Sequence, residues 1–160
     1  MFNIASFVDL ENWIARVWQG QRVLIKPWAI DFSFGNIASG TTGSVTQKIN
    51  SNADFVLSDY RFSYGEGGGG DFAEVLLQIV DNGSLERFFA DEVPLIIPAK
   101  NMSDPFVSST TTPSTFRRIA GNSSVTATLR HPAGGTVTAN DVHLLMIGVL
   151  VFTYSQSVQR

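Results

Sequence analysis

The stretch VHLLMIGVLVFTY, residues 142–154, is apolar on both of the faces that a β-strand presents. One row consists of Val142, Leu144, Met146, Leu150 and Phe152, and the other of Leu145, Ile147, Val149 and Val151. We expect one row to face the core of a sandwich. An exposed aliphatic row of this length would be an association site, so an N-terminal helix or a neighbouring chain must cover the other row. Gly148 is expected to mark a bulge or a close approach of two backbones.

Upstream segments with a period of two predict the other strands. In residues 72–80 and 123–130, apolar and polar side chains alternate, which is typical of an antiparallel strand with one buried face. The dipeptide Asn82-Gly83 predicts a type I′ hairpin turn. The expected buried residues are Ala73, Val75, Leu77 and Ile79 in the first segment and Val125, Ala127 and Leu129 in the second. The expected strands are 44–50, 53–64, 72–80, 85–90, 123–130 and 141–154, with weaker candidates at 93–97 and 115–119.

Residues 6–19 have the period of an amphipathic helix, with Ser6 as its expected cap and Gly20 as its expected stop. A helix of this length is marginal in isolation, so its apolar stripe needs a surface to pack on. The stripe packs either on the sheet of its own domain or, as an arm, on another subunit. We predict a subunit interface made by the stripe residues Phe7, Leu10, Trp13, Ile14, Val17 and Trp18.

The stretch after the helix suggests a boundary. Pro27 limits part of residues 22–34 to an edge strand or an extended arm, and residues 35–44 are a link of small side chains. We therefore expect residues 1–42 to form an N-terminal helix and arm, and residues 43–160 to form the β-sandwich domain. The predicted fold is all-β: an antiparallel, jelly-roll-like β-sandwich with an N-terminal amphipathic helix and an extended arm.

Composition excludes several classes of function. The chain has 160 residues, no cysteine and a net charge of -3, so disulfides, thiolate zinc sites and cysteine nucleophiles are unavailable. Its charged fraction of 16% is below the average of about 25% for soluble domains, which favours surface that faces protein. Its basic residues are scattered, so we expect no nucleic-acid partner. The longest apolar run, residues 142–152, is about half a membrane-spanning length, and we expect no membrane span.

The sequence contains no strong candidate for a catalytic site. The two histidines, His131 and His143, lack a metal-ligand motif; we expect His131 to be a turn residue and His143 to lie on a strand face. The acids Glu86, Asp91 and Glu92 are expected to be solvated carboxylates rather than a glycosidase pair. We therefore expect no enzyme activity, no cofactor and no metal.

Two long loops are candidate contact surfaces. Residues 65–71 read GEGGGGD, and residues 98–115 are rich in proline, serine and threonine. Loops of this length are usually functional or disordered. Glu66 and Asp71 superficially match calcium-binding glycine repeats, but a single copy is weak evidence.

Residues 49–154 resemble a group of phage virion structural proteins of single jelly-roll type. The segments that carry the resemblance are INSNADFVLSDYRF (49–62), FAEVLLQIVDNGSLERFFADEVPL (72–95), PSTFRRIAGNSSVTATLRH (113–131) and NDVHLLMIGVLVFTY (140–154). Such proteins serve as minor capsid, vertex or decoration components. The first 43 residues lie outside the resemblance.

These observations predict a structural virion subunit that forms a homo-oligomer and contacts other virion proteins after assembly in the host bacterial cytoplasm. The alternative is a receptor- or carbohydrate-binding module of a phage fibre or spike. In that case the loops 65–71 and 98–115 would bind a host-surface glycan.

Overall fold

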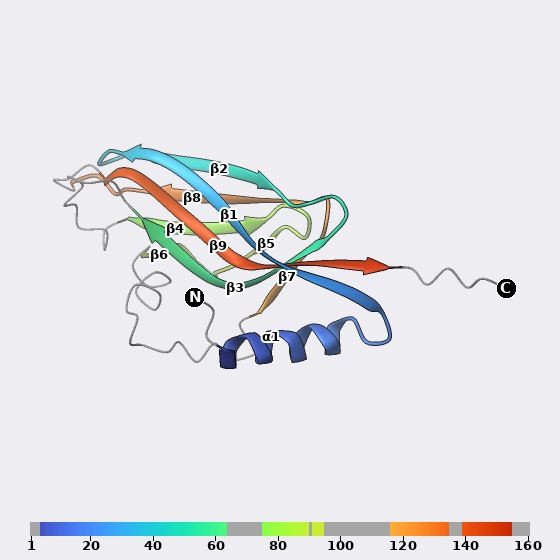
Figure 1. Ribbon diagram of the computed structural model, residues 1–160. Helices are drawn as coiled ribbons and strands as arrows, with labels where there is room; N and C mark the ends of the chain where they lie inside the picture. Colours follow the sequence, from blue (N-terminus) through green and yellow to red (C-terminus); the bar gives the residue numbers. More distant parts are fainter. Residues whose placement is uncertain (1–3, 64–74, 90, 95–115, 135–138, 155–160) are drawn as a thin grey trace.

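The computed structural model describes residues 4–63, 75–89, 91–94, 116–134 and 139–154 (Figure 1). Within these residues, one helix, α1 (Ile4–Val17), precedes an all-β arrangement of antiparallel strands. The strands are β1 (Arg22–Ile37), β2 (Thr42–Lys48), β3 (Asp54–Ser63), β4 (Leu76–Asp81), β5 (Glu86–Arg87), β6 (Val93–Pro94), β7 (Arg117–Ile119), β8 (Ser124–Arg130) and β9 (Ala139–Tyr154). The predicted strands are confirmed within the described residues, with shorter versions of the segments expected at 85–90 and 93–97.

The strands form a sandwich of two sheets. The first sheet has the order β1-β9-β3-β7, and the second has β2-β8-β4-β5 with β6 paired to β4. The pairs are nested along the chain: β1 with β9, β2 with β8, β3 with β7, and β4 with β5. The chain therefore alternates between the two sheets from β1 to β4 and again from β7 to β9, while β4, β5 and β6 all lie in the second sheet. Strands from its two ends, β1 and β9, lie side by side.

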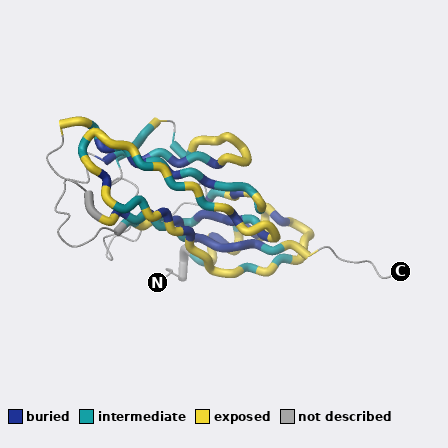
Figure 2. The backbone as a smooth tube through the Cα atoms, turned by 90° about the horizontal axis from the view of Figure 1, so that it is seen from above, coloured by how far each residue is buried: buried dark blue, intermediate teal, exposed yellow. Residues whose placement is uncertain are grey.

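The core lies between the sheets and follows the predicted alternation. Buried and less buried residues alternate along the strands (Figure 2). In β4 and β8, the residues Leu77, Ile79, Val125, Ala127 and Leu129 are fully buried in the core. Val75 is also buried there, while Ala73 lies outside the described residues. The threonine and serine side chains of β8 face outward, where Thr126 and Thr128 exchange hydrogen bonds with Thr46 and Ser44 of β2 at 2.8 and 2.9 Å.

Strand β1 corrects the expected division at residue 42. It pairs with β9 from Arg22, opposite Tyr154, to Ile37, opposite Ala139. Its residues Ile30, Phe32 and Ile37 belong to the main core. Residues 22–37 are therefore an edge strand of the sandwich and not a separate arm. Pro27 is tolerated because β1 is at the edge of its sheet.

Gly148 is the close approach expected in β9. A Cβ atom at this position would lie 2.0 Å from the carbonyl oxygen of Val56 in β3. The pairing of β3 with β9 shifts register between Leu57 and Asp59, directly beside Gly148. Both predicted features, a bulge and a backbone contact, therefore occur here, and only glycine fits.

The β4–β5 hairpin forms, but the expected type I′ turn is wrong. Asp81 pairs with Glu86, so the loop has four residues, and its positive φ is at Leu85 (59°) instead of at Asn82 and Gly83. The Asp81 carboxylate stabilises the wider loop by accepting hydrogen bonds from the Gly83 amide and the Ser84 hydroxyl, each at 2.9 Å. Position 83 has room only for glycine, because an added Cβ would lie 2.8 Å from the Cβ of Ser123.

Candidate functional site

The apolar stripe of α1 packs on the chain's own first sheet. Leu10, Ile14 and Trp18 are buried in a second apolar cluster. The first sheet contributes Val56, Val149 and Val151 to this cluster, and Phe116, which directly precedes β7, completes it. The arrangement corrects the prediction that these three helix residues form a subunit interface: they are already covered within the chain.

The remaining stripe residues are only partly covered. Trp13 is half-buried and meets Trp18 and Phe116 edge to face, with ring centroids 6.2 and 6.0 Å apart. Phe7 is half-buried, and Val17 is 40% exposed. The helix starts at Ile4, so Ser6 lies inside it and is not its cap, whereas Gly20 has the positive φ (78°) expected just after a helix end. The alternative in which the helix packs on its own sheet is therefore the observed one.

A different apolar surface is exposed at the end of the β1–β9 pair. We call it the ribbon strip, and it consists of Leu24, Trp28, Phe152 and Tyr154. Trp28 is 54%, Tyr154 52% and Leu24 40% exposed, while Phe152 is half-buried. The N-terminal end of β1 and the C-terminal end of β9 extend past the strands of the second sheet (Figure 1).

The four residues of the ribbon strip share one face of the sheet. Leu24 lies directly opposite Phe152, and Trp28 and Tyr154 follow at even spacing along the same two strands. Ile30 and Phe32 continue this row into the core. The strip is thus the core-facing row of the first sheet, prolonged beyond the cover that the second sheet provides. Lys26 in the same row places its Nζ 5.3 Å from the centre of the Phe152 ring.

The free backbone edge of β1 is poorly suited to pairing with a strand of another protein, so the ribbon strip is the better contact surface. The Asp31 carbonyl accepts a hydrogen bond from Gln47 Nε2 at 2.8 Å, which shows that it points away from β9. Because the register from Arg22 to Ser33 is continuous, the backbone groups of Pro27 also point away from β9. Proline offers no N–H there, and the neighbouring Lys26 is charged; both features oppose strand addition at a free edge.

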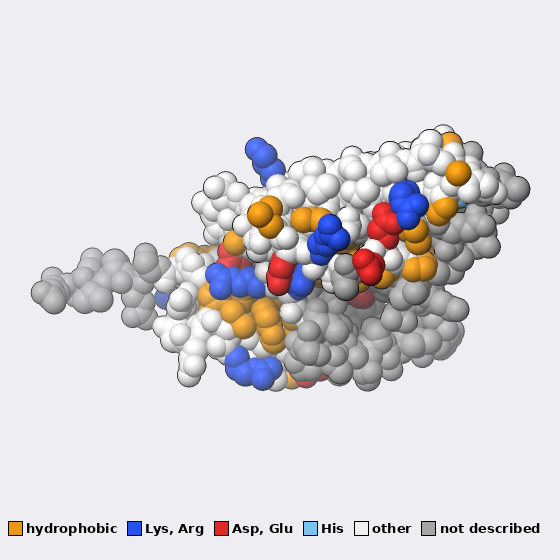
Figure 3. All heavy atoms as spheres, turned by 180° about the vertical axis from the view of Figure 1, so that it is seen from behind, with side chains coloured by type: hydrophobic (Ala, Val, Ile, Leu, Met, Phe, Trp, Pro, Cys, Tyr) orange, Lys and Arg blue, Asp and Glu red, His pale blue; other side chains and the backbone are white. Residues whose placement is uncertain are grey.

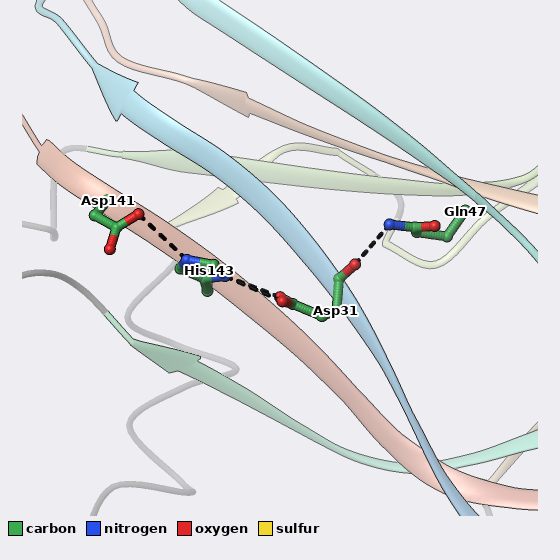
Figure 4. Close-up of polar contacts among 4 residues, drawn as sticks. All are labelled: Asp31, Gln47, Asp141 and His143. Atoms are coloured by element: carbon green, nitrogen blue, oxygen red, sulfur yellow. Dashed lines mark hydrogen bonds and ion pairs between the residues drawn. The ribbon is translucent and has the colours of Figure 1, made fainter.

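His143 lies between two carboxylates on the outward face of the first sheet (Figure 4). Its Nδ1 is 3.1 Å from Asp31 Oδ1, and its Nε2 is 3.3 Å from Asp141 Oδ1. The hydrogen bond with Asp31 is the main cause that raises the pKa of His143 above its ordinary value, with a smaller contribution from Asp141 and partial opposition from burial. The two carboxylates occupy different nitrogens of the ring, an arrangement that suits a bound proton better than a shared metal ion. Within the described residues, no three His, Asp or Glu side chains are grouped to hold a metal.

The other candidate polar residues lie in local contacts. His131 is buried, and its backbone N–H donates to the Thr41 carbonyl at 2.9 Å. Glu86 is 3.7 Å from Arg117, while Glu92 forms a bidentate pair with Arg130 beside the exposed Asp91. The hydrogen bonds from Arg130 lower the pKa of Glu92. In Figure 3, acidic and basic side chains lie interspersed among uncharged ones.

The loops 65–71 and 98–115, with Glu66 and Asp71, lie outside the described residues. In the part of the chain that is described, no helix is long and apolar enough to cross a membrane. A scan against protein-family models finds no match. A search of curated proteins finds no match either.

The sequence reasoning did not find the ribbon strip, although a signal for it was present. The even-numbered residues from Leu24 to Phe34 are apolar except Lys26, so their alternation continues on both sides of Pro27. The row was missed because Pro27 was taken to limit part of this stretch to an edge strand or an extended arm. The row alone also does not reveal that only its second half lies under the other sheet.

Proposed function

We propose that this chain is a non-catalytic structural subunit of a phage virion that assembles through protein contacts, with the ribbon strip as a contact surface. The observation that carries the proposal is the exposure of Leu24, Trp28 and Tyr154 on one face of a single projecting ribbon. Tryptophan and tyrosine are enriched among the residues that dominate binding energy at protein interfaces. Three half-exposed large apolar side chains on adjacent strands are typical of a surface that another protein covers.

The strand order supports this proposal. Nested pairing of β1 with β9, β2 with β8, β3 with β7 and β4 with β5 is what results when a long antiparallel hairpin is rolled into two sheets. We take this order as that of a jelly roll, a sandwich that is common in viral capsid proteins and in lectins. Because a fold does not determine a function, the exposed residues carry more weight than the topology.

The size of the strip limits how strongly it binds by itself. Full burial of a large apolar side chain contributes about 1.5–3 kcal/mol, so a half-exposed one contributes about 1 kcal/mol. A total of roughly 3–4 kcal/mol is less than the cost of association, which is about 4–15 kcal/mol. We therefore expect weak, concentration-dependent association in solution and stable contact only where each subunit meets several neighbours, as in a particle.

The test is the oligomeric state over a series of protein concentrations, measured by sedimentation velocity. The double variant Leu24→Ser, Trp28→Ser should shift association to higher concentration, because it removes two apolar side chains of the strip. The matched control is Leu85→Ser, since Leu85 is 80% exposed but lies in the β4–β5 turn. Association that responds equally to both variants, or a wild-type chain that stays monomeric at every concentration, would count against the strip as a homo-oligomer contact.

The same rings distinguish the carbohydrate-binding alternative. Exposed Trp28 and Tyr154 could also stack on sugar rings, because an aromatic face packs on their C–H groups. Glycan binding by a strictly monomeric protein, lost on Trp28→Ser and kept in Leu85→Ser, would favour that function over assembly.

A further inference from the structure

Asn82-Gly83 is the only Asn-Gly pair in the sequence, and this pair is prone to deamidation. The reaction starts when the Gly83 amide nitrogen loses its proton and attacks the Asn82 side-chain carbon Cγ. A C–N bond forms within a five-membered succinimide, and the bond from Cγ to the side-chain nitrogen breaks, which releases ammonia. Water then opens the ring to aspartate or isoaspartate. The sum is the exchange of ammonia for water, without any oxidant or cofactor.

The folded turn holds both reacting groups away from this reaction. Asn82 Nδ2 donates hydrogen bonds to Ser124 Oγ and Thr126 Oγ1 of β8, each at 2.9 Å. The Asn82 backbone N–H donates to the Ser124 carbonyl, also at 2.9 Å. The Asn82 side-chain nitrogen, which would leave as ammonia, is therefore held on β8, and Asn82 Cγ cannot turn freely toward the Gly83 nitrogen.

The nucleophile is restrained as well. The Gly83 N–H donates to Asp81 Oδ1 at 2.9 Å, and this negative charge opposes loss of the amide proton. Gly83 cannot easily become a bulkier, slower-reacting neighbour, because its Cβ would lie 2.8 Å from the Cβ of Ser123. The turn thus keeps the most reactive neighbour for asparagine and restrains both groups with hydrogen bonds.

We propose that Asn82 is the deamidation site of this chain and that its hydrogen bonds to Ser124 and Thr126 set the rate. Attack requires the β4–β5 turn to detach from β8. The product carries a new negative charge next to Asp81, and isoaspartate adds one backbone atom between β4 and β5. Modification therefore loosens this hairpin at the edge of the second sheet.

The experiment follows isoaspartate and the accompanying mass gain at Asn82 by peptide mapping of the full chain in mildly alkaline buffer. The folded wild type should react roughly tenfold or more slowly than the chain in urea, because local opening must come first. The double variant Ser124→Ala, Thr126→Val should react several times faster than the folded wild type. Its far-UV spectrum and urea midpoint establish that it is folded.

Two controls separate the turn from general stability. Thr128→Val removes a similar hydrogen bond, to Ser44, on the same face and should leave the rate unchanged. Ile14→Ala lowers global stability without touching the turn, so it shows how much global unfolding alone accelerates the reaction. Equal rates in buffer and in urea would overturn the proposal. The proposal would also fail if the double variant reacted no faster than the wild type. It would fail as well if the double variant reacted no faster than Ile14→Ala under conditions in which the two variants have the same free energy of unfolding.

Discussion

The two faces of the β1–β9 pair are both apolar, yet one is covered and the other is partly exposed. On the outward face, α1 covers Val149 and Val151, with Val23 and Ile25 packed against the same cluster. On the core-facing side, the ribbon strip extends past the second sheet and leaves Trp28 more than half exposed. The difference shows that an apolar row in the sequence indicates only that some surface must cover it. Whether the chain itself supplies the cover depends on where the neighbouring elements end.

The substitution Gly148→Ala should disturb both faces of the β1–β9 pair at once. In Gly148→Ala, the added Cβ meets the Val56 carbonyl at 2.0 Å, so β9 has to move away from β3. Because backbone and not a flexible side chain must move, we expect a loss of stability above the usual overpacking range of about 1–3 kcal/mol. Urea unfolding measures it, provided that the variant folds.

Gly35→Ala is the control for this prediction. Nothing lies within 4 Å of its added Cβ, and only the positive φ of 64° is unfavourable. We expect a cost of about 1–2 kcal/mol. Equal losses in the two variants would mean that the contact between β9 and β3 is looser than described.

Ile14→Ala tests the covered face. Ile14 is buried against the sheet, and removing it leaves a cavity between α1 and β9, so we expect a loss of about 3 kcal/mol in the free energy of unfolding. Val17→Ala, on the exposed side of the same helix, should cost less than about 1 kcal/mol. Urea unfolding of both variants checks the difference. A stable Ile14→Ala chain that changed only its oligomeric state would restore the helix as a subunit contact.

In contrast to Ile14→Ala, the substitution Trp28→Ser should weaken association more than it lowers the free energy of unfolding. Because its side chain is already 54% exposed, we expect Trp28→Ser to change the free energy of unfolding by no more than about 1 kcal/mol while it weakens association. Parallel unfolding and sedimentation measurements on the same sample provide the comparison. A large loss of stability would place Trp28 in the core and remove the strip from consideration as a contact surface.

The smallest expected effect is a dependence of stability on pH at His143. Its pKa is raised in the folded protein, chiefly by the hydrogen bond with Asp31, so the folded state binds the proton more tightly than the unfolded chain. The stabilisation is therefore fully present below the ordinary histidine pKa of about 6.5 and is lost as the pH rises through the folded value. NMR titration of the ring measures that value. Asp31→Asn should lower it more than Asp141→Asn, and the reverse order would contradict the described geometry.

Much of the fold and a part of the site could be predicted because they depend on local patterns. The alternation in β4 and β8, the two apolar rows of β9 and the amphipathic period of α1 each follow from neighbouring residues. The turn at residues 82–85 could not be predicted from Asn-Gly alone, because the Asp81 carboxylate and the approach of Ser123 select a wider loop. The His143 cluster was also out of reach, since Asp31 lies 112 positions away in the sequence.

The sequence by itself determined that this chain is an all-β sandwich with one amphipathic helix and a last strand that needs cover on both faces. Those properties arise from side-chain periodicity, which acts over a few residues. Only the tertiary structure decided that β1 joins the first sheet, that α1 covers β9 within the same chain, and that the apolar row of β1 continues beyond the second sheet. Each of these depends on the relative lengths and placement of elements far apart in the chain, which local patterns do not encode.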